Sequence, residues 1–159
     1  IYTTGLNKKD SKLPNSSIPH LFVDRGGKIT FHGPGQIIFY FLISLDRNKL
    51  SIRQLVAGIE NAILIFLKSK NIIGELKKNA PGVYINKKKI TSIGLRLKKG
   101  YTYHGVSLNV NMNLAPFLDI NPCGYEGLKM AQLKEYLPKL SQSEVEKEVL
   151  EQFKLFLGN

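Results

Sequence analysis

The sequence is short of several residue types that define whole classes of protein. Its 159 residues include one cysteine, two methionines and no tryptophan. A lone cysteine cannot form an internal disulfide, so the chain is not a disulfide-stapled secreted scaffold, and a reducing compartment is expected. The composition of 43% hydrophobic and 22% charged residues excludes disordered and collagen-like chains. Cys123 then needs an explanation in packing or in chemistry.

Long apolar stretches and acidic residues are also scarce. The longest apolar run, residues 37–45, includes Ser44 and is typical of a buried strand. A membrane span needs about twenty apolar residues, so no span is predicted. The chain has 12 Asp plus Glu against 23 Lys plus Arg, a formal net charge of +11. This excess fits nucleic acid, an anionic membrane surface or an acidic protein.

The organisation along the chain predicts a single domain over residues 1–159. No internal repeat, low-complexity tract or long linker divides the sequence, and residues 7–17 are expected to form a polar loop. The chain begins with Ile1 in what is expected to be a strand, so we expect the natural N-terminus to lie further upstream.

Hydrophobic periodicity predicts two helices, over residues 51–70 and 143–157, because apolar residues recur there every three or four positions. Ser141 and Glu144 predict a capping box at the start of the second helix. The remaining runs are rich in β-formers and paired around the long helix, which favours an α+β fold over a doubly wound sheet. The predicted strands are residues 21–23, 29–31, 37–45, 72–76, 83–85, 90–97 and 103–110.

Glycine is densest in residues 25–36, where four glycines and a proline surround a short β-rich run. Such a segment can bring backbone close to a ligand, although a pair of tight turns explains it equally well. A phosphate-binding loop is excluded, since Phe22 stands where its first glycine is required and no Ser or Thr follows Lys28. His32 slightly favours a ligand site, although a simple turn hydrogen bond would also explain it.

Cys123 is a candidate nucleophile because it lies in a Pro-Cys-Gly loop rather than inside a helix or strand. A thiol needs a neighbouring cation or base to form the thiolate. Strand alternation places Lys89 with Thr91, Ile93 and Leu95 on the more apolar face of residues 88–98. There it either extends to solvent at the strand end or is partly desolvated and able to exchange protons near neutral pH. The sequence leaves both alternatives open.

Other chemistries lack the residues that they require. The three histidines are scattered singly without a second cysteine, so no metal site is predicted, and the G-x-S-x-G pattern of serine hydrolases is absent. The lysine runs could bind phosphate, but no nucleic-acid module signature accompanies them.

Five sequence blocks, taken together, resemble the lipoyl(octanoyl) transferase family. They occur in the family's order, and five linked blocks are far more specific than one. The blocks are RGGKITFHGPGQ at residues 25–36, GVYI at 82–85, KITSIG at 89–94, HGVSLNVN at 104–111 and NPCGY at 121–125.

The resemblance implies an α+β fold with a mixed or antiparallel sheet flanked by helices, shared with biotin and lipoate protein ligases. It implies Cys123 as the acyl acceptor and Lys89 as its partner, although Lys87 and Lys88 make the choice of lysine depend on register. Ser107 stands where a small apolar residue is common in the family. The acyl-binding residues of the family fall on Arg25, Gly26, Gly27, Lys28, Ile29, Thr30, Phe31, His32, Ser92, Ile93, Gly94, Gly105, Val106 and Ser107.

The implied reaction is the first step of endogenous protein lipoylation, in which an octanoyl group moves from acyl carrier protein to a lysine of a lipoyl domain. The donor is octanoyl-phosphopantetheine, and neither ATP nor another cofactor is implied. The implied acceptors are lipoyl domains of 2-oxoacid dehydrogenase complexes and the glycine cleavage H protein. The resemblance further implies a cytoplasmic monomer without nucleic-acid or membrane partners.

Two alternatives stay open at this stage. An ATP-dependent lipoate or biotin ligase of the same fold would bind an acyl-adenylate at the Arg25 segment, although the lone cysteine counts against it. A basic nucleic-acid or membrane-surface module would bind generic nucleic acid with steep salt dependence and would form no acyl adduct.

Overall fold

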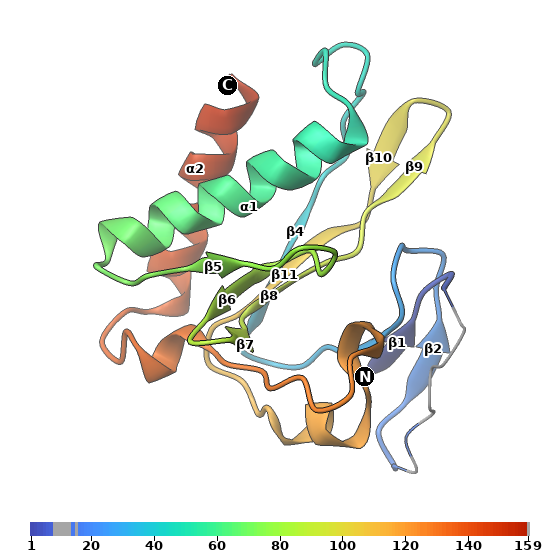
Figure 1. Ribbon diagram of the computed structural model, residues 1–159, viewed down its shortest axis with the longest axis vertical. Helices are drawn as coiled ribbons and strands as arrows, with labels where there is room; N and C mark the ends of the chain where they lie inside the picture. Colours follow the sequence, from blue (N-terminus) through green and yellow to red (C-terminus); the bar gives the residue numbers. More distant parts are fainter. Residues whose placement is uncertain (8–13, 15, 159) are drawn as a thin grey trace.

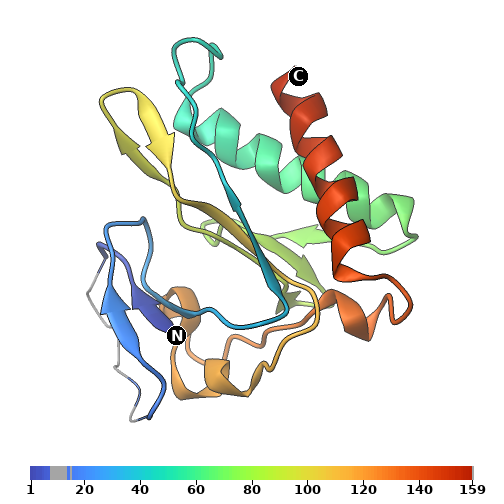
Figure 2. The ribbon, with the colours of Figure 1, turned by 180° about the vertical axis from the view of Figure 1, so that it is seen from behind.

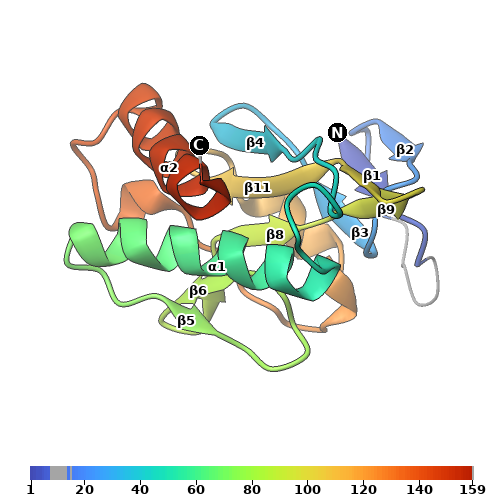
Figure 3. The same ribbon diagram turned by 90° about the horizontal axis from the view of Figure 1, so that it is seen from above.

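The computed structural model describes residues 1–7, 14 and 16–158, with Cys123 described by its backbone alone. Most of the expected polar loop at residues 7–17 therefore lies outside the described residues. Two helices cross on one side of the sheets, and a small lobe formed by the first strands lies on the other side (Figures 1 and 2). Figure 3, seen from above, shows the central strands between these two parts.

The strands of the described residues form four small sheets, mostly antiparallel. In the small lobe, β1 (Tyr2–Thr4) pairs parallel with β2 (His20–Phe22) and antiparallel with β3 (Ile29–Phe31). The other strands are β4 (Gln36–Tyr40), β5 (Glu75–Leu76), β6 (Val83–Ile85), β7 (Lys88–Lys89), β8 (Thr91–Ile93), β9 (Arg96–Lys98), β10 (Tyr101–Tyr103) and β11 (Gly105–Asn109). The central sheet has the antiparallel order β4-β11-β8. Strands β9 and β10 form a two-stranded ribbon, and β5, β6 and β7 form a third three-stranded sheet.

Both predicted helices are confirmed, as α1 (Ile52–Ser69) and α2 (Gln142–Leu157). Each begins with a capping box, Ser51 with Gln54 and the predicted Ser141 with Glu144, in which side chains and backbone satisfy otherwise unpaired N–H groups. The Ser141 hydrogen bond holds the pKa of the Glu144 carboxyl below its ordinary value. The described part of the chain also contains three short 3₁₀ turns, at Ala115–Asp119, Pro122–Gly124 and Leu133–Glu135.

The apolar stripes of both helices pack on the central sheet and form the main core. The Phe153 ring of α2 lies edge-on to Phe39 and Phe41, with centroids 5.1 and 5.0 Å away. A second, smaller core lies beneath the small lobe and joins it to the first 3₁₀ turn. Its buried members are Tyr2, Ile29, Phe31, Met112, Phe117 and Ile120.

Four predicted strands are shorter or more broken than their sequences indicate. The run at residues 103–110 is interrupted at His104, whose φ of +61° turns the backbone between β10 and β11. Because this partner strand bends there, β4 ends at Tyr40 instead of continuing to residue 45. Residues 90–97 divide between β8 and β9, and only the end of the predicted strand at residues 72–76 pairs, as β5. The α+β class itself is confirmed.

Candidate active site

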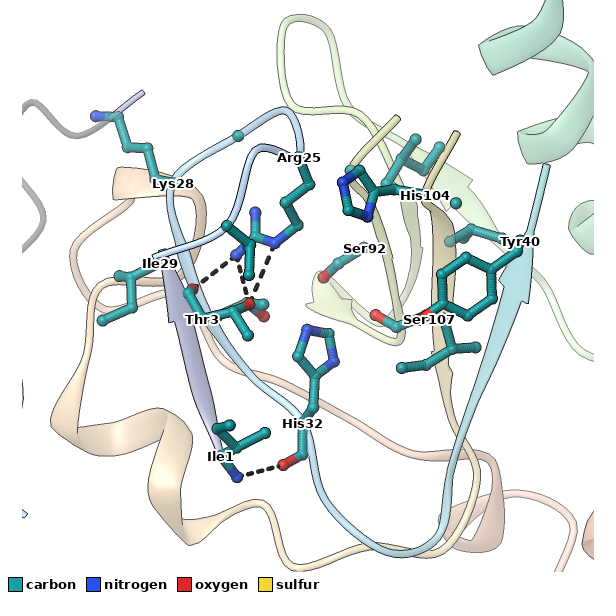
Figure 4. Close-up of a pocket in the computed structure, with 18 residues that line it drawn as sticks. Ile1, Thr3, Arg25, Lys28, Ile29, His32, Tyr40, Ser92, His104 and Ser107 are labelled. Atoms are coloured by element: carbon teal, nitrogen blue, oxygen red, sulfur yellow. Dashed lines mark hydrogen bonds between the residues drawn. The ribbon is translucent and has the colours of Figure 1, made fainter. Parts of the chain in front are cut away.

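A pocket of about 340 Å³ lies between the small lobe and the central sheet. Its volume falls within the range of small-molecule sites, roughly 300–1,000 Å³. Thr3, Val23 and the β3 segment form one wall, and β4, β8 and β11 form the other, as Figure 4 shows. Apolar and aromatic side chains such as Val23, Ile38 and Tyr40 dominate the lining, so the pocket suits a predominantly hydrocarbon ligand.

Most of the residues expected to bind the acyl group line this pocket, although three blocks far apart in the sequence supply them. These pocket-lining residues are Arg25, Gly27, Lys28, Ile29, Thr30, His32, Ser92, Ile93, Gly94, Gly105, Val106 and Ser107. Gly26 and Phe31 do not line it. The Phe31 side chain instead packs in the second core, 5.5 Å from Tyr2 and 5.7 Å from Phe117 between ring centroids.

Arg25 connects the Gly-rich segment to β1. Its guanidinium donates to the Thr3 carbonyl oxygen at 2.7 Å and to the Thr3 hydroxyl at 2.9 Å, and also to the Gly26 carbonyl oxygen at 2.8 Å. Hydrogen bonds from a charged donor are stronger than neutral ones. Arg25 therefore holds the loop that forms one rim of the pocket (Figure 4).

Asp24 links the segment that precedes the Gly-rich loop to Tyr103 and His104, at the junction of β10 and β11. Its carboxylate oxygens lie 2.8 Å from His104 Nε2 and 2.6 Å from the Tyr103 hydroxyl, which donates to it. The Tyr103 and His104 hydrogen bonds lower the pKa of the Asp24 carboxyl, and the same carboxylate raises the pKa of the Tyr103 hydroxyl. All of these bonds are exposed to solvent, so each contributes little to stability on its own.

Lys89 is buried rather than extended to solvent, with 1% of its surface exposed. Its Nζ donates to the Pro81 carbonyl oxygen at 2.8 Å and lies 5.5 Å from the centroid of the buried Tyr84 ring. The alternative in which Lys89 reaches solvent at the strand end is therefore wrong. Its neighbour Lys88 points instead toward solvent and lies 3.6 Å from the Glu135 carboxylate. Burial thus singles out Lys89 from the run of three lysines.

Gly82 makes room for the Lys89 side chain. A Cβ at this position would lie 2.7 Å from Lys89 Cε and 3.3 Å from Nζ, and would also collide with the Thr91 carbonyl oxygen. The φ of Gly82 is +129°, a conformation that side chains other than glycine rarely adopt. The glycine of the second sequence block therefore allows the Lys89 ammonium to approach the backbone.

Cys123 lies in the 3₁₀ turn Pro122–Gly124. The Gly124 N–H donates to the Asn121 carbonyl oxygen at 2.9 Å, and the Tyr125 hydroxyl donates to the Asn79 carbonyl oxygen. The end of the Lys28 side chain packs directly against Gly124. The turn is therefore held against both the Gly-rich segment and the loop preceding β6.

The segment that follows the Cys123 turn pairs with Lys89. The Lys89 N–H donates to the Lys129 carbonyl oxygen and the Ala131 N–H donates to the Lys89 carbonyl oxygen, both at 2.9 Å. Met130 thus forms a parallel bridge with Lys89. Backbone hydrogen bonds bring the two sequence blocks to one place, and the pairing of the Cys123 thiol with Lys89 stays a prediction.

Some lining residues were not predicted from the sequence: Ile1, Thr3, Val23, Ile38, Tyr40 and His104. Ile38 and Tyr40 alternate on the same face of β4 and are exposed, at 39% and 64%. Large exposed apolar residues with a period of two could have indicated a binding face. Thr3 and His104 gave no such signal, because only the tertiary fold brings them to the pocket.

Among the described residues, no group of three or more His, Cys, Asp or Glu side chains is arranged to hold a metal ion. None of the helices in this part of the chain is long and apolar enough to cross a membrane.

Comparison with solved structures defines the class of the fold. A bi-partite lipoate protein ligase from Thermoplasma acidophilum superimposes with a TM-score of 0.76 over 99% of this chain and 67% of that chain, at 14% identity. Biotin protein ligase from Aquifex aeolicus gives a TM-score of 0.62 over 78% of this chain and 53% of that chain, at 22% identity. The fold is the catalytic fold of biotin and lipoate protein ligases.

Sequence comparison identifies the family within that class. The model of the lipoyl protein ligase A/B catalytic domain matches residues 3–154. Octanoyltransferase from Vibrio campbellii is 48% identical over 96% of this chain and 70% of its own length. Octanoyltransferase from Legionella pneumophila is 45% identical over 96% of this chain and 77% of its own length. The chain therefore belongs to the octanoyltransferase family of acyltransferases, which confirms the resemblance seen in the five sequence blocks.

Proposed function

We propose that this octanoyltransferase, which transfers octanoyl groups to lipoyl domains in lipoate biosynthesis, works through a thioester on Cys123. One observation carries the proposal: the buried Lys89 is hydrogen-bonded through its backbone to the segment that leaves the Cys123 turn. A nucleophile with a neighbouring base is the usual arrangement for covalent acyl transfer. We also propose that residues 1–159 act as one catalytic domain.

In the first half-reaction Lys89 takes the proton of the Cys123 thiol, and the thiolate attacks the carbonyl carbon of the octanoyl thioester. A carbon–sulfur bond to Cys123 forms as the bond to the phosphopantetheine sulfur breaks, and the departing thiolate takes a proton. The developing oxyanion needs preorganised donors, for which backbone N–H groups near Gly94 and Cys123 are candidates. One thioester replaces another, so the step needs no ATP.

In the second half-reaction the amine of the target lysine attacks the Cys123 thioester. An amide bond forms, the thiolate leaves, and Lys89 accepts the proton that the amine loses. The two protein substrates therefore bind in turn, in a ping-pong scheme. The apolar pocket holds the acyl chain meanwhile, and each buried methylene contributes about 0.8 kcal/mol.

A basic groove of about 620 Å³ next to the site supports acidic protein partners. Its lysines are Lys77, Lys78, Lys87, Lys88 and Lys129. Lys77 Nζ lies 4.4 Å from the centroid of the Tyr84 ring, the same ring that Lys89 approaches, so the groove adjoins the proposed catalytic lysine. Complementary charge steers protein encounters, and we propose that acyl carrier protein and lipoyl domains approach here. The lone cysteine supports a cytoplasmic location.

Incubation with octanoyl-acyl carrier protein, without ATP, tests the proposal by intact mass. We expect an octanoyl adduct on the wild-type chain, released by a lipoyl domain, and no thioester on Cys123→Ser. Lys89→Met should slow adduct formation strongly, whereas the exposed control Lys147→Met, on α2 and outside the groove, should not. An unmodified wild-type mass, or an adduct that requires ATP, would contradict the mechanism.

A further inference from the structure

A chain of side-chain hydrogen bonds runs from the segment beside Lys89 to His32 in the pocket. Asn109 Nδ2 donates to the Ala131 carbonyl oxygen at 3.1 Å, and Gln36 Nε2 donates to Asn109 Oδ1 at 2.9 Å. His32 Nδ1 lies 2.7 Å from Gln36 Oε1. None of these residues contributes its polar side chain to the steps proposed above.

The direction of this chain follows from its ends. A backbone carbonyl oxygen can only accept, so the Asn109 amide must turn its NH₂ group toward Ala131 and its oxygen toward Gln36. Gln36 Nε2 faces that oxygen and the Phe31 carbonyl oxygen, which leaves Gln36 Oε1 facing the imidazole. An amide oxygen accepts only, so His32 Nδ1 carries the hydrogen.

The other ring nitrogen is then free to accept from a ligand. Burial lowers the pKa of His32 below its ordinary value, and the nearby Arg25 guanidinium lowers it further, against the opposing effect of the Gln36 hydrogen bond. A neutral imidazole protonated on Nδ1 has a lone pair on Nε2. Among the described residues, His32 Nε2 has no hydrogen-bond partner, and the ring points into the pocket in Figure 4.

Two hydroxyls face the same space. Ser92 of β8 and Ser107 of β11 are directly opposed in the antiparallel register, and both line the pocket. In Figure 4 their side chains and the His32 ring point into one part of the cavity. Two serines and one lone pair thus form a polar spot within a mainly apolar lining.

We infer that His32, Ser92 and Ser107 form a subsite that binds a hydroxyl group on the acyl chain, so that the pocket takes hydroxyacyl as well as plain acyl groups. This inference rests on the proposed use of the pocket for the acyl chain. A hydroxyl is the matching group, because it donates one hydrogen bond, to His32 Nε2, and accepts others, from the serines. A site built to bond a substrate hydroxyl distinguishes it from the analogue without one.

The histidine tautomer is tested first, on the free protein. Long-range ¹H–¹⁵N correlation spectra of the histidines should show His32 with a protonated Nδ1 and an unprotonated Nε2 at neutral pH, assigned by loss of the signal in His32→Gln. In Gln36→Met the fixed tautomer should give way to a mixture, whereas the exposed control Gln142→Met should leave it intact. A His32 protonated on Nε2 in the wild-type chain would overturn the inference.

The subsite is tested with octanoyl and monohydroxylated octanoyl thioesters, the hydroxyl moved along successive carbons of the chain. At one position the wild-type chain should form its adduct with the hydroxylated chain at least as fast as with octanoyl. Ser107→Ala should lower that preference about tenfold, the effect of losing one hydrogen bond, while the surface control Ser143→Ala should retain it. An equal preference in wild type and Ser107→Ala at every position would overturn the inference.

The two levels of failure can be distinguished. If no acyl adduct forms at all, the proposed function fails, whereas the His32 spectrum of the free protein is unaffected by that result. If the octanoyl adduct forms normally but no hydroxylated chain is favoured, the subsite alone is wrong.

Discussion

Replacing Gly82 by alanine tests whether this glycine positions Lys89. The new Cβ would lie 2.7 Å from Lys89 Cε, about 0.7 Å short of an ordinary 3.4 Å contact, so the lysine must move. A misplacement of roughly 1 Å at a reacting group can cost about 100-fold in rate. We therefore expect Gly82→Ala to slow formation of the octanoyl adduct by about that factor.

The same substitution carries a stability cost. A residue other than glycine at a φ of +129° is strained by about 1–3 kcal/mol, and overpacking against the Thr91 carbonyl adds about 1–3 kcal/mol. Denaturant unfolding measures this loss, and single-turnover mass spectrometry measures the rate under conditions where both proteins stay folded.

Gly127→Ala is the matched control. Gly127 also has a positive φ, +71°, but a Cβ there meets no atom within 4 Å. The Gly127→Ala variant should lose only about 1–2 kcal/mol of unfolding free energy and should form the octanoyl adduct at the wild-type rate. If Gly82→Ala acylated as fast as Gly127→Ala, the positioning of Lys89 by Gly82 would be refuted.

Three further predictions concern the core, the pocket and the groove. Phe153→Ala should cost about 3–5 kcal/mol of unfolding free energy in denaturant titrations, because it removes a buried ring from between Phe39 and Phe41. Burial lowers the pKa of His32, so as the pH falls the unfolded chain takes up the His32 proton before the folded chain does. The free energy of unfolding should therefore fall as the pH falls below about 6.5, and His32→Gln should flatten this slope in thermal melts recorded at a series of pH values. Replacing Lys77 and Lys78 together by glutamine should slow association with acyl carrier protein in stopped-flow experiments and weaken its salt dependence.

Each of these predictions has a contradicting result. Leu155→Ala, exposed on the same helix as Phe153, should cost under about 0.5 kcal/mol, and an equal loss in both variants would contradict the packing argument. If the free energy of unfolding of His32→Gln depended on pH as steeply as that of the wild type, groups other than His32 would be responsible for the dependence. Lys147→Gln, on the exposed face of α2, should leave association unchanged, and an equal effect would show that net charge matters rather than the groove.

The helices could be predicted from the sequence because their signals are local. Periodicity and the Ser141 capping box depend on residues within a few positions of one another, and the structure confirms both. The strand at residues 37–45 was predicted too long because its end depends on His104, about sixty residues away, which bends its partner. Strand propensity contains no information about such a partner.

The candidate site could be predicted from the sequence only in part. Alternation placed Lys89 on the apolar face, but whether it reached solvent depended on Pro81, Gly82 and Tyr84, which surround it only in the folded chain. The resemblance indicated most of the pocket lining, but Phe31, which it also indicated, does not line the pocket because its ring packs in the second core. Inward and outward side chains alternate along a strand, so a contiguous motif such as residues 25–32 overstates the lining.

The pocket lies between two parts of the molecule that have separate hydrophobic cores. The main core does not have to open when the small lobe opens, so the small lobe can unfold locally at a lower free energy than the whole chain. A ligand that touches both walls opposes this opening in proportion to its binding free energy. Acylation of the protein should therefore slow amide hydrogen exchange in β1 to β3 more than in α1, making the small lobe a reporter of pocket occupancy.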